Sequence, residues 1–163
     1  MQRIVCKAGD VVIGGGSRIV IQSMCNTDTL DVAASVRQCE DLAEAGCEMI
    51  RLTTQGLRQV SALDEIRKAL RSEDINIPLV ADVHFNSEVA IAAAAGIADK
   101  VRINPGNFSK DHDVAMAKLR ELLQVCKDHG TALRIGLNHG SLGERITSVW
   151  GDTPLGMCNA IME

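Results

Sequence analysis

Short apolar segments alternate with amphipathic segments along most of the chain, and this alternation constrains the fold more than any other feature of the sequence. The apolar segments have the length of strands that are buried on both faces, which favours a parallel sheet. The amphipathic segments have the length of helices, and a new strand starts after roughly 20 to 35 residues, the size of one βα unit. The sequence therefore predicts an α/β fold of five βα units.

Local signals place the boundaries of these elements. Asp31 and Ser87 are the expected N-caps of two helices, and Gly46, Gly96 and Gly130 are expected to end helices. Strands are expected at residues 19–24, 48–53, 78–83, 100–103 and 132–137. Helices are expected at residues 31–45, 57–71, 87–95 and 111–129, with a last helix from Thr153.

An N-terminal β-hairpin is expected before these units. Residues 11–13 and 19–21 are apolar, and they flank the run Gly14, Gly15 and Gly16. The three glycines are not a phosphate-binding P-loop, because no Gly-Lys-Ser/Thr sequence follows them. We therefore expect them to form the turn of the hairpin.

The length of 163 residues bears on the choice between two α/β architectures. Five strands are enough for a doubly wound sheet, whereas a complete (β/α)₈ barrel needs about 250 residues. The last expected helix reaches Glu163 without a capping residue or a glycine stop. We expect a partial (β/α)₈ TIM barrel, in which residues 1–163 are the N-terminal part of a TIM-barrel substrate-binding domain.

The composition argues against several classes of partner. Phe85, Phe108 and Trp150 are the only aromatic residues, too few for a platform that stacks bases. The formal net charge of −4 speaks against nucleic-acid binding, although not against a local basic pocket. The longest apolar run, residues 89–95, is too short to span a membrane, and the N-terminus lacks the apolar region of a signal peptide. These features predict a cytoplasmic protein that binds neither nucleic acid nor membranes.

Six cysteines raise the question of a metal centre. They are Cys6, Cys25, Cys39, Cys47, Cys126 and Cys158. No two of them have the C-x-x-C spacing that zinc ribbons and motif-type iron–sulfur sites use. We therefore expect reduced thiols and no metal ligand in this chain.

Polar side chains gather where the expected strands end. Arg51 and Thr53, Asp82 and His84, and Arg102 and Asn104 are spaced by two residues, Arg134 and Asn138 by four, and Gln22 and Asn26 belong to the first strand end. Because strand side chains alternate between the two faces of a sheet, each of these pairs projects to one face. Ligands of α/β proteins bind at the carboxyl ends of parallel strands, so the sequence predicts a ligand site there.

Three of these residues, Arg51, Arg102 and Arg134, predict that the ligand is an anion. The guanidinium group is always charged, and its fork of N–H donors matches phosphate oxygens. A single strand-end arginine more often forms a structural salt bridge. Three converging cations are costly to bury unless an anion neutralises them, which favours a site for two phosphate groups.

The spacing of Asp82 and His84 leaves two interpretations open. In the first, the two side chains form hydrogen bonds to substrate hydroxyls, and His84 acts as an acid. In the second, Asp82 pairs with a neighbouring arginine and His84 only packs at the strand end.

Five segments, in this order, resemble the 4-hydroxy-3-methylbut-2-en-1-yl diphosphate synthases of non-mevalonate isoprenoid biosynthesis. They are IQSMCNT at 21–27, IRLTTQG at 50–56, PLVADVHF at 78–85, VRINPGN at 101–107 and LRIGLNHGSL at 133–142. The sequences TTQG, NHGSL and WGDTP resemble the larger variant of the family, which carries an additional middle domain. The resemblance covers nearly the whole chain.

The resemblance implies a reductive ring opening of 2-C-methyl-D-erythritol 2,4-cyclodiphosphate with loss of water. Ferredoxin or flavodoxin would supply two electrons through a [4Fe–4S] cluster. Matched segment by segment, Arg51, Arg102 and Arg134 would hold phosphate oxygens. The residues that would line the same mouth are Asp82, His84, Asn104 and Asn138, of which Asp82 and His84 are the candidate catalytic residues.

In this family three cysteines and a glutamate on a separate C-terminal domain hold the cluster, and no cysteine of this chain matches them. We expect that domain to lie outside this chain, so that the fragment alone is inactive. Unpaired strand edges of a partial barrel favour a homodimer. Two other hypotheses remain open: a pteroate-synthase-like barrel that binds a diphosphate substrate without a cluster, and a stand-alone, non-catalytic βα module for binding or assembly.

Overall fold

The computed structural model describes residues 4–84, 86–108, 111–138 and 140–162. Phe85 and His139, which belong to two of the segments above, lie outside the described residues. The strands are β1 (Val5–Ala8), β2 (Val11–Gly14), β3 (Gln22–Met24), β4 (Met49–Thr54), β5 (Leu79–Val83), β6 (Lys100–Ile103) and β7 (Ala132–Ile135). The helices are α1 (Val32–Glu44), α2 (Leu57–Ser72), α3 (Ser87–Ala94), α4 (His112–His129), α5 (Glu144–Trp150) and α6 (Pro154–Met162), with a 3₁₀ turn η1 (Pro105–Asn107).

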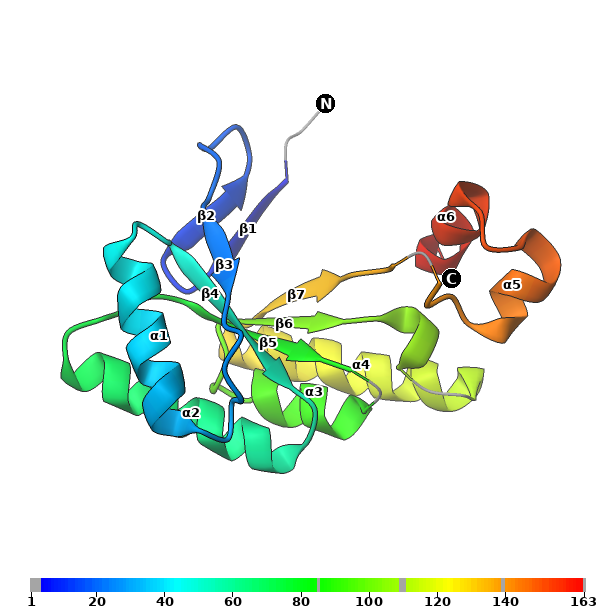
Figure 1. The fold of residues 1–163 in the computed structure, drawn as a ribbon. Coiled ribbons are helices and arrows are strands. Elements are labelled where there is room, and N and C mark those ends of the chain that lie inside the picture. The colour runs from blue at the N-terminus through cyan, green and yellow to red at the C-terminus, as the bar shows by residue number, and fades with distance from the viewer. Residues whose placement is uncertain (1–3, 85, 109–110, 139, 163) are drawn as a thin grey trace.

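The topology is that of a partial (β/α)₈ barrel. Strands β3 to β7 form a parallel sheet in chain order, and α1, α2, α3 and α4 connect successive strands. Figure 1 shows these four helices on the same side of the sheet. A doubly wound sheet would reverse its strand order at a switch point and carry helices on both faces. The prediction of five barrel units is therefore confirmed, and the face opposite the four helices is open.

Two apolar clusters explain how this sheet is held. The larger cluster fills the space between the sheet and the helices and includes Ile50, Leu79, Val101 and Leu122, each 1% exposed or less. Side chains of opposite parity in the same strands form the smaller cluster, in which Met49, Val80 and Ala132 pack against the hairpin residue Ala8. The hairpin thus covers the amino end of the open face and leaves its carboxyl end uncovered.

The N-terminal hairpin exists, but its predicted turn is wrong. Strand β1 pairs with β2 in antiparallel register, from Val5 opposite Gly14 to Ala8 opposite Val11. The turn is therefore Gly9–Asp10, in which Gly9 has φ +56, as the first position of a type II′ turn requires. Gly14 is instead the last residue of β2, and Gly15 and Gly16 follow the strand. Residues 5–8 were missed because their sequence, VCKA, shows no regular alternation of apolar and polar side chains.

The element boundaries otherwise differ from the prediction by a few residues at strand and helix ends. Asp31 caps α1 through the amide of Ala34, as predicted, but α3 is capped by Asn86, whose side chain accepts from Glu88 N at 3.0 Å, and not by Ser87. The strand expected at 19–24 shortens to Gln22–Met24, which lies at one edge of the described sheet.

The segment after β7 departs most from the prediction. It holds two helices, of which α5 was not predicted, while α6 begins after Thr153, whose hydroxyl accepts from Gly156 N at 3.1 Å. In Figure 1 both helices lie beyond the carboxyl end of β7, apart from the four sheet-packed helices. Within the described part of the chain, no helix combines the length and the apolar character that crossing a bilayer requires.

Candidate anion-binding site

Two rows of side chains cross the open face of the sheet. The strand register places Thr53, Asp82, Arg102 and Arg134 side by side in one row. The row nearer the amino ends contains Arg51, Val80, Lys100 and Ala132. Because neighbouring parallel strands present the same face at paired positions, the three arginines predicted from the sequence share this face.

Asp82 is the centre of the polar cluster. Its side chain is 1% exposed, its Oδ2 accepts from Nη2 of Arg51 at 2.5 Å, and its Oδ1 accepts from Nη1 of Arg102 at 3.1 Å. A buried carboxylate requires such compensation, because an unpaired buried charge costs several kcal/mol. Asp82 therefore pairs with neighbouring arginines, as the second interpretation of this residue predicted.

Arg102 connects three strands. Besides Asp82 of β5, its guanidinium contacts His84 and donates from Nη2 to the carbonyl of Gly136 at 2.8 Å, just beyond β7. Gly136 makes this position possible, since a Cβ there would lie 2.6 Å from Nε of Arg102. The role of Gly136 was not predicted from the sequence, where this glycine lies inside the strand expected at 132–137.

His84 lies within hydrogen-bond distance of Arg102, with 2.8 Å between its Nε2 and the Nη1 of the arginine. Arginine can only donate, so Nε2 of His84 is the acceptor and carries no proton in this arrangement. The neutral ring therefore has its proton on Nδ1. The Nε2 atom is also 3.9 Å from Oδ1 of Asp82.

Arg51 has an unsatisfied donor. Its Nε–H is buried and forms no hydrogen bond to any described residue, while Nη2 is bound to Asp82. A buried donor without an acceptor costs free energy comparable to a lost hydrogen bond. The side chain as a whole is 22% exposed, so a ligand can contact the guanidinium, whereas Nε itself is not accessible to solvent.

Lys100 is a fourth cation on this face, which sequence analysis missed. Burial lowers the pKa of its ammonium group, and the charges of Arg134 and Arg51 lower it further. Lys100 has the same strand parity as Arg102, which was the available signal. The two rows thus contain four cations, Arg51, Lys100, Arg102 and Arg134, against the single carboxylate of Asp82.

Asn104 and Asn138 join two loops at the carboxyl ends of β6 and β7. The Nδ2 of Asn104 donates to Oγ of Ser141 at 2.9 Å, and its Oδ1 accepts from the amide of Gly106. Asn138 takes part through its backbone, whose carbonyl accepts from the Ser141 hydroxyl. Asn138 is exposed and lies beyond β7, so strand parity does not place its side chain.

Two other residues that were predicted to lie at strand ends make their contacts elsewhere. Gln22 is the first residue of β3 and not its carboxyl end, and with Met49 and Lys100 it lines a cavity of about 360 Å³ next to the hairpin. Asn26 follows β3 as predicted, but its side chain accepts from Nε2 of Gln38 in α1 at 2.7 Å.

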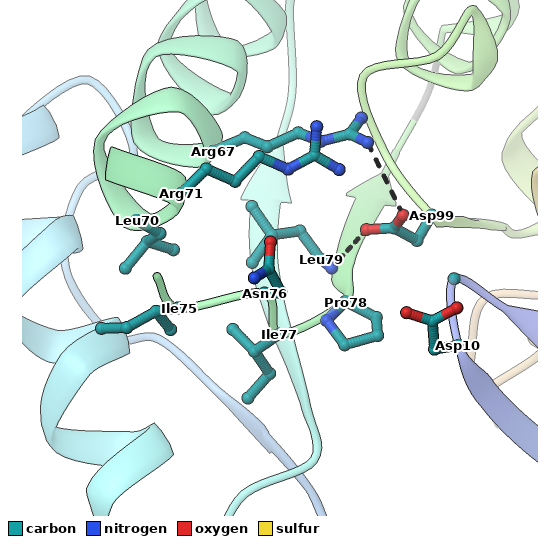
Figure 2. Close-up of a pocket in the computed structure, with 11 residues that line it drawn as sticks. Asp10, Arg67, Leu70, Arg71, Ile75, Asn76, Ile77, Pro78, Leu79 and Asp99 are labelled. Atoms are coloured by element: carbon teal, nitrogen blue, oxygen red, sulfur yellow. Dashed lines mark hydrogen bonds and ion pairs between the residues drawn. The ribbon is translucent and has the colours of Figure 1, made fainter. Parts of the chain in front are cut away.

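A cavity of about 230 Å³ at the amino ends of β5 and β6 is not a second candidate (Figure 2). Arg67 of α2 points across it toward Asp99, which also accepts from the amide of Leu79 at 2.9 Å. Arg67 further donates to the carbonyls of Gly96 and Ile97. These contacts tie α2 to the turn before β6, and polar groups at this end of a barrel serve stability.

The described residues contain no group of three or more His, Cys, Asp or Glu side chains that could hold a metal ion. The six cysteines are free thiols, and of these Cys25 and Cys39 lie together, with 3.7 Å between their sulfur atoms. Two thiols do not supply the ligand set of a [4Fe–4S] cluster. The part of this chain that the structure describes does not fit that cofactor.

Comparison with known proteins gives one consistent result. Residues 3–163 match the family model described as the GcpE TIM-barrel domain. A 4-hydroxy-3-methylbut-2-en-1-yl diphosphate synthase (flavodoxin) of Parabacteroides distasonis is 46% identical over 98% of this chain and 29% of its own length. A synthase of the same name (ferredoxin) from a Synechococcus species is 45% identical over 95% of this chain and 43% of its own length. The chain thus spans less than half of the length of these relatives.

A solved structure provides an independent comparison of the fold. The chain resembles a Burkholderia cenocepacia dihydropteroate synthase complexed with 7,8-dihydropteroate, with a TM-score of 0.53 over 87% of this chain and 65% of that one. The two sequences are 15% identical, so this likeness concerns the fold alone.

Proposed function

The chain belongs to the GcpE TIM-barrel domain family, and from this premise we propose that the open face of its sheet binds the diphosphate of a small cyclic substrate. The proposed substrate is 2-C-methyl-D-erythritol 2,4-cyclodiphosphate, which the whole protein would open reductively to 4-hydroxy-3-methylbut-2-enyl diphosphate. The relatives named above carry the name of that product in their own names.

The observation that carries the proposal is the excess of cations on the open face. Arg51, Lys100, Arg102 and Arg134 face one carboxylate, which leaves three positive charges uncompensated within the two rows. A diphosphate supplies negative charge of this order, and its oxygens accept the donors that the protein leaves unsatisfied. The buried Nε–H of Arg51 is such a donor.

The roles of the cations differ. Arg102 is 4% exposed, and its guanidinium contacts Asp82, His84 and Gly136. We therefore assign it mainly to holding the cluster together, while a remaining N–H can donate to a phosphate oxygen. Arg134 is exposed, and Lys100 is half-buried beside it. These two, together with Arg51, are the proposed direct phosphate contacts.

Asp82 and His84 are proposed to orient the substrate. Asp82 fixes the guanidinium groups of Arg51 and Arg102 on either side of itself, so that their remaining donors converge. The unprotonated Nε2 of His84 can accept a hydrogen bond from a substrate hydroxyl when Arg102 turns to a phosphate oxygen.

Asn104 and Asn138 complete the proposed mouth. The bond from Asn104 to Ser141 joins the loops after β6 and β7, and so holds their backbone amides at the rim of the site. Amides in such turns can contact phosphate oxygens.

The redox part of the proposed reaction belongs to the rest of the protein. A [4Fe–4S] cluster would supply the two electrons, and we propose ferredoxin or flavodoxin as donor because the relatives are named after these carriers. Since the residues described here do not fit a cluster, no step of the chemistry is assigned to them beyond binding and orientation. We further propose that the whole protein is a homodimer of the larger family variant.

Calorimetric titration of the full-length protein with the cyclic diphosphate tests the proposal. Replacing Arg134 with Gln removes one charge-assisted contact, so we expect the affinity to fall by about 10- to 100-fold, that is by about 1.4 to 2.7 kcal/mol. The matched control is Arg120→Gln, which removes the same charge from an exposed position of α4 and should leave the affinity unchanged. Equal affinities of the two variants would refute the assignment.

A further inference from the structure

Two buried thiols lie in contact beside the rim of the open face. Cys25 directly follows β3, Cys39 lies in the middle of α1, and their sulfur atoms are 3.7 Å apart. The two residues are 6% and 0% exposed. Both are free thiols, and no described interaction joins any other two cysteines of the chain.

The segment between these cysteines is already fastened to α1 by side-chain hydrogen bonds. Gln38 accepts from the amides of Asn26 and Thr27 at 3.0 and 3.2 Å, and donates to the side chain of Asn26 at 2.7 Å. The hydroxyls of Thr27 and Ser35 are 2.9 Å apart. The loop is therefore held in the conformation that brings the two sulfur atoms together.

This loop is in direct contact with β4, which carries part of the polar cluster. The amide of Cys25 donates to the carbonyl of Arg51 at 2.9 Å, and the hydroxyl of Thr29 donates to the carbonyl of Thr53 at 2.7 Å. A covalent bond between Cys25 and Cys39 would thus tie α1 to the strand that holds Arg51.

We propose that Cys25 and Cys39 form a reversible disulfide, which locks the loop between β3 and α1 against the carboxyl end of β4. The sulfur atoms must approach from 3.7 Å to about 2.05 Å, a shift that side-chain rotation and a small movement of the loop can supply. The proposal goes beyond diphosphate binding and does not depend on it.

The oxidant is a low-molecular-weight disulfide of the glutathione type. The thiolate of Cys25 attacks one sulfur of this disulfide, forms a mixed disulfide and releases one thiolate. Cys39 then loses its proton and attacks the Cys25 sulfur, which releases the second thiolate. The two protein thiols are oxidised by two electrons, the reagent is reduced to two thiols, and two protons are transferred in total.

The electrostatics of the pair support this order of events. A hydrogen bond from Cys39 lowers the pKa of the Cys25 thiol, whereas the same contact and burial raise the pKa of Cys39. Cys25, at the loop, is also the more exposed of the two. Cys25 is therefore the attacking thiol, and Cys39 is the resolving one.

Disulfide mapping on the full-length protein tests the proposal. The reduced protein is incubated anaerobically in glutathione buffers with an increasing proportion of the disulfide form, until its number of free thiols is constant. Each sample is then quenched in acid, alkylated, digested and analysed by mass spectrometry. We expect a Cys25–Cys39 linkage in a buffer in which the buried Cys126 is still a free thiol and is therefore alkylated. Amide exchange at residues 26–31 should then be several-fold slower than in the reduced protein.

The variants sharpen the test. Cys25→Ser and Cys39→Ser should each lose both the linkage and the slower exchange, whereas Cys126→Ser should keep both. Two alkylated thiols at positions 25 and 39, in a buffer that converts the exposed Cys6 and Cys158 to glutathione adducts, would overturn the proposal. A separate glutathione adduct on Cys25 without the linkage, or a linkage without slower exchange, would also overturn it. If a serine variant fails to fold, the linkage map of the unsubstituted protein still decides.

Discussion

At the scale of single residues, the polar cluster depends on one carboxylate. Asp82 accepts from two guanidinium groups while it is almost inaccessible to solvent, so it neutralises charge that the sheet would otherwise bury unpaired. The same contacts fix the directions in which Arg51 and Arg102 present their remaining donors. Asp82 therefore contributes both to the stability of the fold and to the proposed binding geometry.

Replacing Asp82 with Asn should destabilise the protein by about 3 kcal/mol, because two cations lose their counter-charge and one of them is buried. Denaturant unfolding of the full-length protein measures the change. The control is Asp64→Asn, which breaks an exposed pair with Lys68 on α2 and should cost less than about 0.5 kcal/mol. Similar losses for both variants would contradict the central role of Asp82.

Replacing Lys100 with Met should have opposite effects on stability and on binding. The pKa of Lys100 is lowered in the folded protein, so its charged form opposes folding below that pKa, and this cost disappears as the pH rises toward the unfolded value of 10.5. The variant should be slightly more stable at pH 7, by less than about 1 kcal/mol because the side chain is only half-buried, and should bind diphosphate more weakly. Unfolding measurements at pH 7 and near pH 10 should show that the difference in stability between the variant and the unsubstituted protein is smaller at the higher pH. The control is Lys127→Met, at an exposed position.

Residue identities could be predicted from the sequence better than their contacts. Period-two spacing placed Arg51, Asp82 and Arg102 on one face, because alternation in a strand is a local property. The role of Gly136 could not be predicted, since it depends on how closely Arg102 approaches from a neighbouring strand. The contact of Ser141 with Asn104 likewise joins loops that are distant in sequence.

At the scale of elements, the boundaries of the predicted helices were more accurate than those of the strands, although α5 was not predicted. Capping residues mark helix ends within the sequence itself, as Asp31 and Asp111 do. The extent of a strand depends on its partners: β3 keeps three residues, and Ile19 before it is 91% exposed. The hairpin turn was misplaced for a similar reason, because pairing with residues 5–8 was not visible in their composition.

The correction at the start of α3 gives a direct test at this scale. Asn86→Ala should cost about 1 kcal/mol, because the amide of Glu88 loses its acceptor. Ser87→Ala should be nearly neutral, since Ser87 is the first helical residue and not the cap. Thermal unfolding of the two variants measures both effects, and the reverse order would restore Ser87 as the cap.

At the scale of the whole molecule, the fold separates stability from binding along the strand direction. The hairpin and the Arg67–Asp99 contacts hold the amino ends of the strands, while the row of Asp82, Arg102 and Arg134 and the loops of Asn104 and Cys25 lie toward the carboxyl ends. The row that contains Arg51 and Lys100 lies between them and the hairpin. Four helices cover one face and leave the other open to a ligand. The sequential strand order and the family match agree on this architecture.

A crystal structure of the full-length protein with the bound cyclic diphosphate tests the central claim most directly. We predict a phosphate oxygen within hydrogen-bond distance of Nε of Arg51, with a second phosphate near Lys100 and Arg134, while Asp82 keeps its contacts with Arg51 and Arg102. A diphosphate bound elsewhere, with the Nε of Arg51 still unpaired, would contradict the claim that this face is the substrate site.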